Sequence, residues 1–242
     1  MRNREHLPED RLLLCLLGLA RREIRLEQVF DPIAESYDRW YDTFEGQSIF
    51  AAEVKCLRSL CAHLKGRWLE VGVGTGRFAS ILCVTRGIDP SVPMLKIAAG
   101  RGIMPYAGLA EDLPFQEDSF DGVLLALTFC FLTDPGRALE ECGRVLRPQG
   151  NLLLGVVPAH SSWGRMYERK KAEGHHVYAF ARFFNIPEIV ALIQNTGFTF
   201  RGAASTLFWN PKEPPEKEPC VETGISSGAG FVGLLFARTN DF

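Results

Sequence analysis

The sequence lacks a strong charge of either sign, and it has no long basic region that could neutralise a nucleic-acid backbone. Its 27 Lys and Arg residues are balanced by 29 Asp and Glu residues, which gives a net charge of -2. Nucleic-acid binding depends on a basic surface, so this balance argues against nucleic acid as a partner. The one dense basic run, residues 165–171, is interleaved with Glu168 and followed by Glu173, as expected of a solvated helix face.

Metal-ligand spacing is also absent from the sequence. The seven cysteines are an odd number, and neither a Cys-x-x-Cys pair nor a Cys/His cluster occurs among them. This usage predicts no metal centre, and it predicts reduced, mostly buried thiols in a cytoplasmic protein. His175 and His176 are adjacent in the sequence, so on a helix or a strand their side chains would point in different directions.

No hydrophobic run in the sequence is long enough to span a bilayer. The N-terminal run LLLCLLGL, residues 12–19, is too short for that. The acidic residues Glu5, Glu9 and Asp10 precede it, where a signal peptide would be basic. We therefore expect no stable membrane insertion, and we interpret this run as an accessory or packing helix. A peripheral membrane helix is the alternative.

From residue 48 onward the sequence alternates between helical and strand patterns. Apolar residues spaced by four and three over residues 50–64 predict an amphipathic helix. The continuous apolar run at residues 122–129 predicts a strand buried on both faces. Further strands are expected at residues 67–71, 85–88, 104–106, 151–157, 198–209 and 229–238.

This alternation predicts the fold class: α/β, with a doubly wound, mainly parallel, seven-stranded Rossmann-like sheet. The last two strands have no helix between them, so they must pair as an antiparallel hairpin. Ser91 and Asp134 stand where helix N-caps are expected. We expect an N-terminal helical extension and lid at residues 1–47 and a ligand-binding domain at residues 48–242, with an insertion near residues 158–184.

The stretch WLEVGVGTGRFA, residues 68–79, places Gly72, Gly74 and Gly76 directly after a buried strand. In a doubly wound sheet this first strand-to-helix turn is where ligands bind, because glycine lets the backbone approach them closely. GTGRFA also satisfies the GxGxxA pattern of dinucleotide-binding proteins. Asp89 ends the next expected strand and could accept hydrogen bonds from ribose hydroxyls in either case. The loop alone leaves the ligand open.

Four stretches in order resolve this ambiguity: LEVGVGTGRF, GIDPSVPML, GLAEDLPFQEDSFDGV and ALEECGRVLRPQG. With them the sequence resembles the class I S-adenosylmethionine-dependent methyltransferases, specifically the type-11 small-molecule family related to the quinone-biosynthesis methyltransferases. The resemblance covers roughly residues 30–200 and implies a methyltransferase with S-adenosyl-L-methionine as cofactor. Two alternatives remain: a catalytically silent protein that binds this cofactor, and an NAD-type dehydrogenase, in which the last two stretches have no role.

The resemblance also implies the cofactor-binding residues. Glu70 and the glycine loop would surround the methionine part of the cofactor, and Asp89 would accept hydrogen bonds from both ribose hydroxyls. Pro90 and Met94 would lie against the adenine. Core packing is the alternative for Met94 and for Phe129. The full set, in chain order, is Tyr37, Glu70, Gly72, Val73, Gly74, Gly76, Asp89, Pro90, Met94, Ala110, Glu111, Thr128 and Phe129.

Within this set, Ala110 and Glu111 would reach the adenine edge, while Thr128 and Phe129 would line the floor beneath the sulfonium. Many relatives carry an aspartate where this chain has Leu109. A leucine cannot accept a hydrogen bond from the adenine amino group, so that contact must come from the backbone, water or Glu111.

Two segments are expected to form the site of the methyl acceptor. In relatives, the segment that matches residues 30–47 folds over the cofactor as a lid, and here it carries Tyr37. The insertion carries His175, His176 and Tyr178, which we predict as the catalytic group, since a titrating histidine there could remove a proton from the acceptor. Structural or surface roles are the alternative for each of them.

The resemblance favours a small, partly apolar acceptor. Amino-methylating nucleic-acid enzymes carry a tetrapeptide of asparagine or aspartate, two prolines and an aromatic residue after the fourth strand, and this chain has TFCF there, at residues 128–131. The sequence leaves open which atom of the acceptor is methylated, whether a catalytic base exists, and the oligomeric state.

Overall fold

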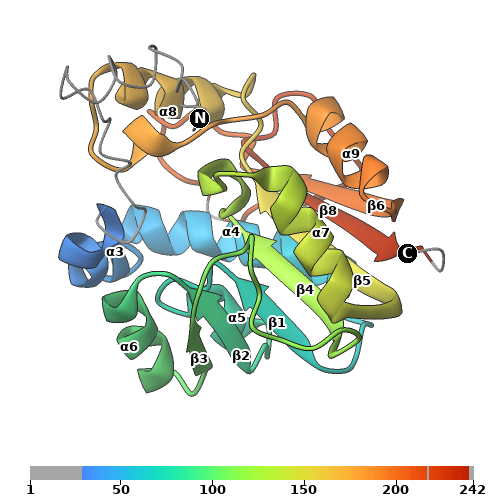
Figure 1. Ribbon diagram of the computed structural model, residues 1–242. Helices are drawn as coiled ribbons and strands as arrows, with labels where there is room; N and C mark the ends of the chain where they lie inside the picture. The colour runs from blue at the N-terminus through green and yellow to red at the C-terminus, as the bar shows by residue number, and fades with distance from the viewer. Residues whose placement is uncertain (1–28, 217, 240–242) are drawn as a thin grey trace, which may run out of the picture.

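The computed structural model describes residues 29–216 and 218–239 of the chain (Figure 1). The apolar run at residues 12–19 lies outside these residues, and so does the helix predicted for it. Among the residues that are described, none of the helices combines the length and the apolar character needed to cross a membrane.

The described residues form one mixed sheet of eight strands in the order β3-β2-β1-β4-β5-β8-β6-β7 (Figure 1). Strands β1 to β5 pair in parallel, whereas β8 lies antiparallel between β5 and β6. The predicted fold class and the antiparallel pairing of the last two long strands are confirmed. The strands are β1 Trp68–Val71, β2 Arg86–Asp89, β3 Met104–Ala107, β4 Phe120–Ala126, β5 Leu146–Val156, β6 Phe198–Thr206, β7 Glu222–Thr223 and β8 Phe231–Arg238.

The predicted number of seven strands is wrong by one within the described chain. The additional strand, β7, consists of two residues that pair with Ala204 and Ser205 at the free edge of β6. It lies in the Pro- and Glu-rich connection between the two long C-terminal strands, where no apolar alternation marks a strand. Its pairing comes from the edge of β6 and not from its own sequence.

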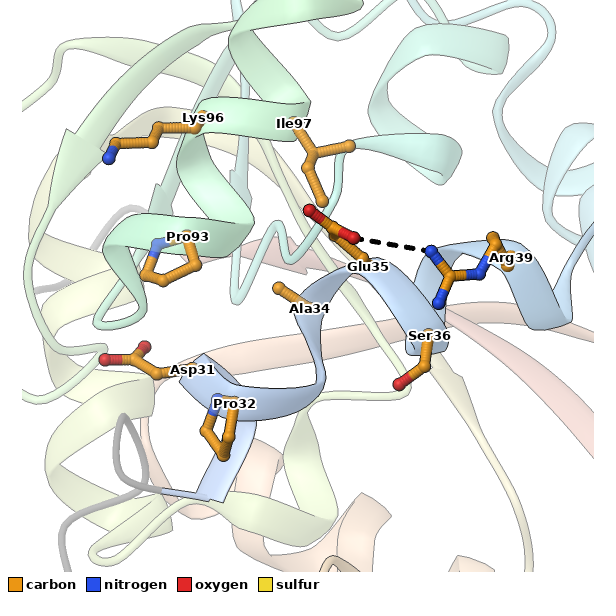
Figure 2. A pocket seen from close by; sticks show the side chains of 9 residues that line it. All are labelled: Asp31, Pro32, Ala34, Glu35, Ser36, Arg39, Pro93, Lys96 and Ile97. Carbon is orange, nitrogen blue, oxygen red and sulfur yellow. Dashed lines mark hydrogen bonds and ion pairs between the residues drawn. The ribbon is translucent and has the colours of Figure 1, made fainter.

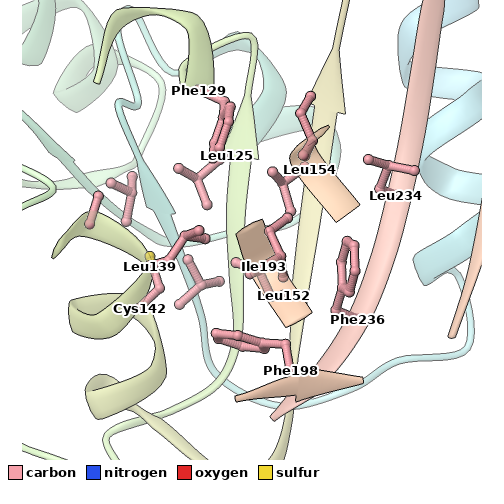
Figure 3. Packing of buried hydrophobic residues seen from close by; sticks show 14 of the residues in the cluster. Leu125, Phe129, Leu139, Cys142, Leu152, Leu154, Ile193, Phe198, Leu234 and Phe236 are labelled. Atoms are coloured by element: carbon pink, nitrogen blue, oxygen red, sulfur yellow. The ribbon is translucent and has the colours of Figure 1, made fainter. Parts of the chain in front are cut away.

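Helices cover both faces of the sheet because alternate residues of the central strands point to opposite sides. Leu152 and Leu154 of β5 belong to one core, whereas Leu153 belongs to the other. The first core packs against α7, Pro135–Val145, and α9, Ile186–Asn195 (Figure 3). The second packs against α4, Phe44–Cys61, α5, Arg77–Ile81, and α6, Val92–Gly100.

The helix starts follow the capping chemistry of the sequence. The Ser91 hydroxyl accepts the N–H of Met94 at the start of α6, and the Asp134 carboxylate accepts the N–H of Arg137 at the start of α7. Both predicted caps are confirmed. Thr43 caps α4 in the same way, so this helix runs across the division predicted after residue 47.

Shorter elements lie outside the sheet and complete the candidate site. The turn η1, Asp31–Ile33, and the helix α3, Ala34–Trp40, pack against α6. The insertion near residues 158–184 folds into α8, Ser162–Ala172, and the turn η3, Tyr178–Phe180, which contact one another (Figure 1). The turn η2, Phe129–Phe131, follows β4.

Candidate cofactor and acceptor site

The glycine loop joins β1 to α5 and lies against the ends of β2 and β4. The N–H groups of Gly72 and Val73 both donate to the Ile88 carbonyl oxygen, at 2.8 and 3.0 Å. A Cβ on Gly72 would lie 2.3 Å from Cγ2 of Thr128, so only glycine permits this close approach. The Val73 side chain is buried in the core, over Gly87.

Gly74 is the member of the loop that faces open space. Its φ is +51°, and a Cβ added there would have no atom within 4 Å. The positive φ strains any other residue, while the open surroundings leave room for a ligand directly against the backbone. The three predicted loop glycines therefore form one concave turn, and Gly74 forms its accessible point.

Asp89 holds this turn from the end of β2. Its Oδ2 accepts the N–H of Gly74 at 2.8 Å and its Oδ1 accepts the N–H of Ser91 at 2.9 Å. Each oxygen keeps a second lone pair, which matches the two hydroxyls of a ribose. Burial raises the pKa of Asp89 to about 6, against the lowering effect of these two hydrogen bonds, and the charge of Asp31 adds to the increase.

Glu70 lies in β1, two residues before the first loop glycine, and is fully enclosed. Its side chain is 1% exposed, and its Oε2 has no hydrogen-bond partner among the described residues. Burial raises its pKa well above the ordinary value, although a hydrogen bond with the Ala79 backbone lowers it. An orphaned buried oxygen next to the glycine loop suits a cationic or hydrogen-bond-donating group of a ligand.

The end of β4 forms the other wall of the turn. Leu127 has φ +58°, an uncommon conformation for a residue with a branched side chain. It turns the chain so that Thr128 meets the glycine loop, and the Thr128 hydroxyl donates to the Gly72 carbonyl oxygen at 3.2 Å. Phe129 lies in the core against Phe184, with ring centroids 5.3 Å apart. Nothing in the sequence near Leu127 indicated this left-handed residue.

The residues predicted at the adenine come from α6, from the turn before it, and from the loop between β3 and β4. Met94 is buried in the first turn of α6, the helix that begins directly after Ser91, and Ala110 is buried in the core. The Oε1 of Glu111 accepts the N–H groups of Thr133 and Asp134 at 3.0 and 3.2 Å, so it fastens the loop before α7. Its Oε2 is left for an adenine amino group, and this role stays a prediction.

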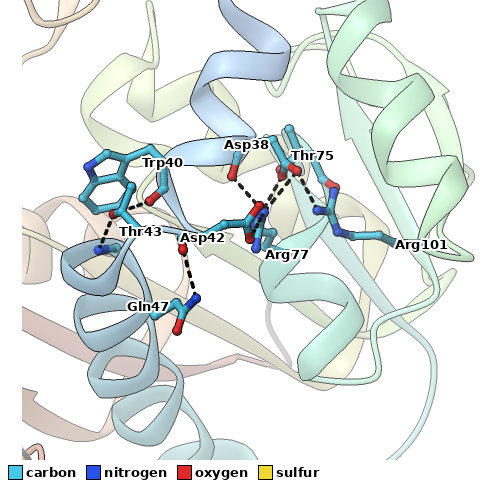
Figure 4. Close-up of polar contacts among 9 residues, drawn as sticks. Asp38, Trp40, Asp42, Thr43, Gln47, Thr75, Arg77 and Arg101 are labelled. Carbon is cyan, nitrogen blue, oxygen red and sulfur yellow. Dashed lines mark hydrogen bonds and ion pairs between the residues drawn. The ribbon is translucent and has the colours of Figure 1, made fainter.

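An ion-pair network fastens α3 to the glycine loop (Figure 4). Asp38 of α3 accepts from Arg77 and from Arg101, both at 2.8 Å, and Arg101 also donates to the Thr75 carbonyl oxygen at 2.7 Å. Arg77 pairs with Asp42 as well, at 2.9 Å. Burial alone would raise the pKa of Asp38, but the hydrogen bonds from both arginines outweigh it and lower the pKa to about 2. Sequence reasoning missed this network.

Tyr37 lies on the inner side of α3. Its hydroxyl lies 3.2 Å from that of Tyr41, which is itself 5% exposed. Burial raises the pKa of Tyr37 to about 12, the bond to Tyr41 lowers it, and the charges of Glu53, Asp89 and Cys130 raise it further. The charges of Asp89, at the end of β2, and of Glu53, in α4, therefore both act on the Tyr37 hydroxyl.

The predicted group His175, His176 and Tyr178 does come together. The two imidazoles stack with centroids 4.9 Å apart. Both residues lie in a loop, so the divergence expected of adjacent residues in a helix or a strand does not apply to them. The Tyr178 ring lies 4.8 Å from His175. His175 Nδ1 accepts the N–H of Val177 at 3.3 Å, and burial, with His176 and Lys170 nearby, lowers the pKa of His175.

A groove of 390 Å³ lies outside the predicted site, between the η1–α3 segment and α6 (Figure 2). Its lining mixes both charges, and Glu35 and Arg39, one turn apart on α3, form an ion pair at 3.4 Å along its edge. The glycine loop and the histidines do not line it. Asp31, at one end, accepts the Ser91 hydroxyl at 2.6 Å and so connects the groove to the turn that holds Asp89.

Comparisons with known proteins agree with this geometry. A family model described as a methyltransferase domain matches residues 69–154. The chain is 38% identical over 201 residues to an uncharacterized protein of Mycobacterium tuberculosis, covering 83% of this chain and 70% of that protein. It is 37% identical over 207 residues to an uncharacterized protein of Methanocaldococcus jannaschii, covering 85% of this chain and 97% of that protein.

Among solved structures, the chain is similar to one from Thermotoga maritima described as an S-adenosylmethionine-dependent methyltransferase and possible histamine N-methyltransferase. The TM-score is 0.81 at 35% identity, and the match covers 89% of this chain and all of that chain. The sheet order, the glycine loop and the acid at the end of β2 define a Rossmann-like nucleotide-cofactor site. The chain belongs to the S-adenosylmethionine-dependent methyltransferase family, with S-adenosylmethionine as its cofactor.

The residues present fit this cofactor. The open turn at Gly74 leaves room against the backbone, and Asp89 offers one lone pair on each oxygen to a ribose hydroxyl. The orphaned Oε2 of Glu70 lies at the loop that would hold the methionine part, whose ammonium is a hydrogen-bond donor. The membership excludes the dehydrogenase alternative.

Proposed function

We propose that the protein transfers the methyl group of S-adenosylmethionine to a small-molecule acceptor bound between α3, α8 and η3. The observation that carries this proposal is the aromatic group that these elements bring together next to the cofactor site: Tyr37 on α3, Tyr167 on α8 and Tyr178 on η3. Such a group suits a small, partly apolar molecule.

Two further observations support a small acceptor. Four stretches of the chain resemble the type-11, quinone-biosynthesis-related methyltransferases, and we include membership of that group in the proposal. The relative from Thermotoga maritima is described as a possible histamine N-methyltransferase, and histamine is a small molecule.

The composition supports two further parts of the proposal. The balanced net charge of -2 supports the absence of a nucleic-acid partner. Seven cysteines without disulfide-like spacing support a cytoplasmic location.

When bound, the cofactor would supply an electrophilic methyl carbon for the acceptor's lone pair, with the thioether sulfur as the leaving group that keeps the electrons of the carbon–sulfur bond. The chain's own contribution is position and exclusion of water. Asp89 and the glycine loop orient the ribose and the methionine part. α3, held to the loop through Asp38, closes over them. Thr128 fixes the end of β4 against the same loop.

The acceptor-side group would then handle the proton that the acceptor loses. In the structure His175 Nδ1 accepts from Val177, so the lone pair of this ring is already used. We therefore propose His176 as the proton acceptor, His175 as the residue that stacks on and orients it, and Tyr178 as the ring that supports both.

The test is a methyl-transfer screen over small metabolites that measures release of S-adenosylhomocysteine, after calorimetry has established cofactor binding. We expect turnover with at least one small acceptor. Cofactor binding without turnover on any acceptor would instead support the catalytically silent alternative. In a second step, the double variant His175→Ala/His176→Ala should lose about tenfold or more of its turnover while cofactor affinity stays unchanged. Full activity of this variant would remove the two histidines from the site.

A further inference from the structure

The segment before α3 is joined to the turn between β2 and α6 by one short hydrogen bond. Ser91 is fully buried, and its hydroxyl donates to Oδ1 of Asp31, in η1, at 2.6 Å. The same hydroxyl oxygen accepts the N–H of Met94 at 3.4 Å, as the N-cap of α6. A hydroxyl-to-carboxylate bond of this length is charge-assisted, so it fixes η1 firmly against the start of α6.

The backbone of Ser91 holds the carboxylate of Asp89. The Ser91 N–H donates to Oδ1 of Asp89 at 2.9 Å, and the Gly74 N–H donates to Oδ2 at 2.8 Å. Three hydrogen bonds therefore connect Asp31, Ser91, Asp89 and the glycine loop in series. Asp31 and Ser91 are 60 residues apart in the chain, so only the tertiary structure brings them together.

Asp31 and Asp38 hold the η1–α3 segment at two points. Asp38 pairs with Arg77 and Arg101 beside the glycine loop, whereas Asp31 binds the turn that follows Asp89. Figure 2 shows Asp31 at the end of the groove between this segment and α6. One anchor is thus at the loop proposed for the methionine part of the cofactor, and the other is at the carboxylate proposed for the ribose.

The contact also brings a second negative charge toward Asp89. Neither Asp31 nor Asp89 forms an ion pair with a cation among the described residues. Burial is the main cause of the raised pKa of Asp89, and the charge of Asp31 adds to it. The charged and titratable groups that act electrostatically with Asp89 come from three elements: Asp31 of η1, Tyr37 of α3 and Glu70 of β1. Within the described chain, only Asp31 among them shares a hydrogen-bonding residue with Asp89.

We propose that Asp31 is a positioning residue for the cofactor: through Ser91 it fixes the turn that orients Asp89, and it places its own charge beside that carboxylate. The inference rests on the assignment of Asp89 to the ribose, and it does not depend on which acceptor is methylated. The oxygen of an asparagine can accept the Ser91 hydroxyl as the carboxylate does, whereas alanine cannot. Asparagine also removes the charge, so the two substitutions separate the hydrogen bond from the charge.

The test is isothermal titration calorimetry with S-adenosylhomocysteine on the full chain. In Asp31→Ala the affinity at about pH 7.5 should fall about threefold or more, because the turn loses its anchor. Asp31→Asn should restore the affinity to within about twofold of the wild type. In a Ser91→Ala background, where the contact is already lost, Asp31→Ala should have almost no further effect. Glu35→Gln removes a charge from the same segment without affecting Ser91, so this control should bind normally.

The pH profile is a readout that a purely structural role of Asp31 would not change. Removal of the charge in Asp31→Asn should lower the pKa of Asp89 from its wild-type value of about 6. The carboxylate then stays ionised to lower pH, and the pH below which cofactor affinity falls should decrease by about 0.3 unit or more. The same calorimetry between about pH 5 and pH 7.5 measures this shift.

The outcomes separate this inference from the assignment on which it rests. If Asp89→Ala binds S-adenosylhomocysteine as tightly as the wild type, the ribose assignment fails, and this inference fails with it. If Asp89→Ala binds weakly but Asp31→Ala binds normally, or loses as much affinity in the Ser91→Ala background, only the role of Asp31 is wrong. If Asp31→Ala does not fold, Asp31→Asn decides: an unchanged pH profile overturns the proposal, and a shift to lower pH supports it.

Discussion

At the residue scale, a single carboxylate organises the proposed cofactor site. Asp89 accepts one backbone N–H on each oxygen, from Gly74 and from Ser91, and these bonds orient its remaining lone pairs. Its burial makes ionisation costly, so the protein maintains an acid with an elevated pKa at the position where two hydroxyl donors are expected. A ligand that donates a hydrogen bond to each oxygen offsets this free-energy cost of ionisation.

Replacement of Asp89 by alanine should weaken S-adenosylhomocysteine binding by about tenfold or more, because two charge-assisted hydrogen bonds are lost. Isothermal titration calorimetry measures the effect. Glu117→Ala, at an exposed position without a hydrogen bond, is the control and should bind normally. Unchanged affinity in Asp89→Ala would refute the ribose assignment.

Cofactor affinity should also depend on pH through Asp89. The pKa is raised to about 6 in the unliganded protein, so the carboxyl is ionised above this pH and protonated below it. Ribose hydroxyls donate to the ionised form, and affinity should therefore be constant above about pH 6 and fall by about tenfold for each unit below it. Calorimetry between about pH 5 and pH 7.5 tests this. In Asp89→Asn the profile should be flat, and a wild-type profile without a slope would contradict the mechanism.

At the scale of the elements, α3 is a short helix that depends on its partners. Seven residues cannot form a stable helix alone. Its position comes from Asp38, which joins it to Arg77 after the glycine loop and to Arg101 after α6. The proposed lid segment is thereby coupled to the glycine loop.

Asp38→Asn should therefore lower both stability and cofactor affinity. We expect a loss of about 1–2 kcal/mol in the free energy of unfolding, since the three side chains are only partly buried. Chemical denaturation measures this loss. The pKa of Asp38 is lowered to about 2 in the folded protein, against about 4 in the unfolded chain. Its contribution to the free energy of unfolding is therefore fully present above about pH 4 and is lost as the pH falls through about 2. Glu35→Gln, which removes an exposed ion pair on the same helix, is the control and should change little. Equal stability of the two variants would argue against the coupling.

At the scale of the whole molecule, the cofactor site is built from segments that span much of the chain. The glycine loop, Asp89, the end of β4 and α3 meet only when the sheet has formed. Ligand binding should therefore stabilise the fold as a unit. S-adenosylhomocysteine at about 100 times its Kd should add about 2.7 kcal/mol and raise the melting temperature by about 5–10 °C.

Differential scanning calorimetry tests this expectation, with NADH as the comparison ligand. NADH should leave the melting temperature unchanged, because the chain is a methyltransferase and not a dehydrogenase. Asp89→Ala, with its affinity weakened about tenfold or more, should lose about half or more of this shift at the same ligand concentration. A shift with NADH as large as with S-adenosylhomocysteine would count against the cofactor specificity.

The sequence by itself determined the fold class, the glycine loop, Asp89 at the next strand end and the caps at Ser91 and Asp134. Each of these depends on a local pattern: a period of two or of about four residues, a glycine at a turn, or an oxygen before a helix. Such patterns involve only a few neighbouring residues, so they can be identified from the sequence alone.

Only the tertiary structure decided which distant side chains meet. It brought Asp38 to Arg77 and Arg101, set Leu127 in a left-handed conformation, and stacked the two histidines. It also left Oε2 of the buried Glu53 without a hydrogen-bond partner among the described residues. The sequence could not show this, because the pairing of a buried charge depends on how separate helices and turns pack, and no local pattern records that packing.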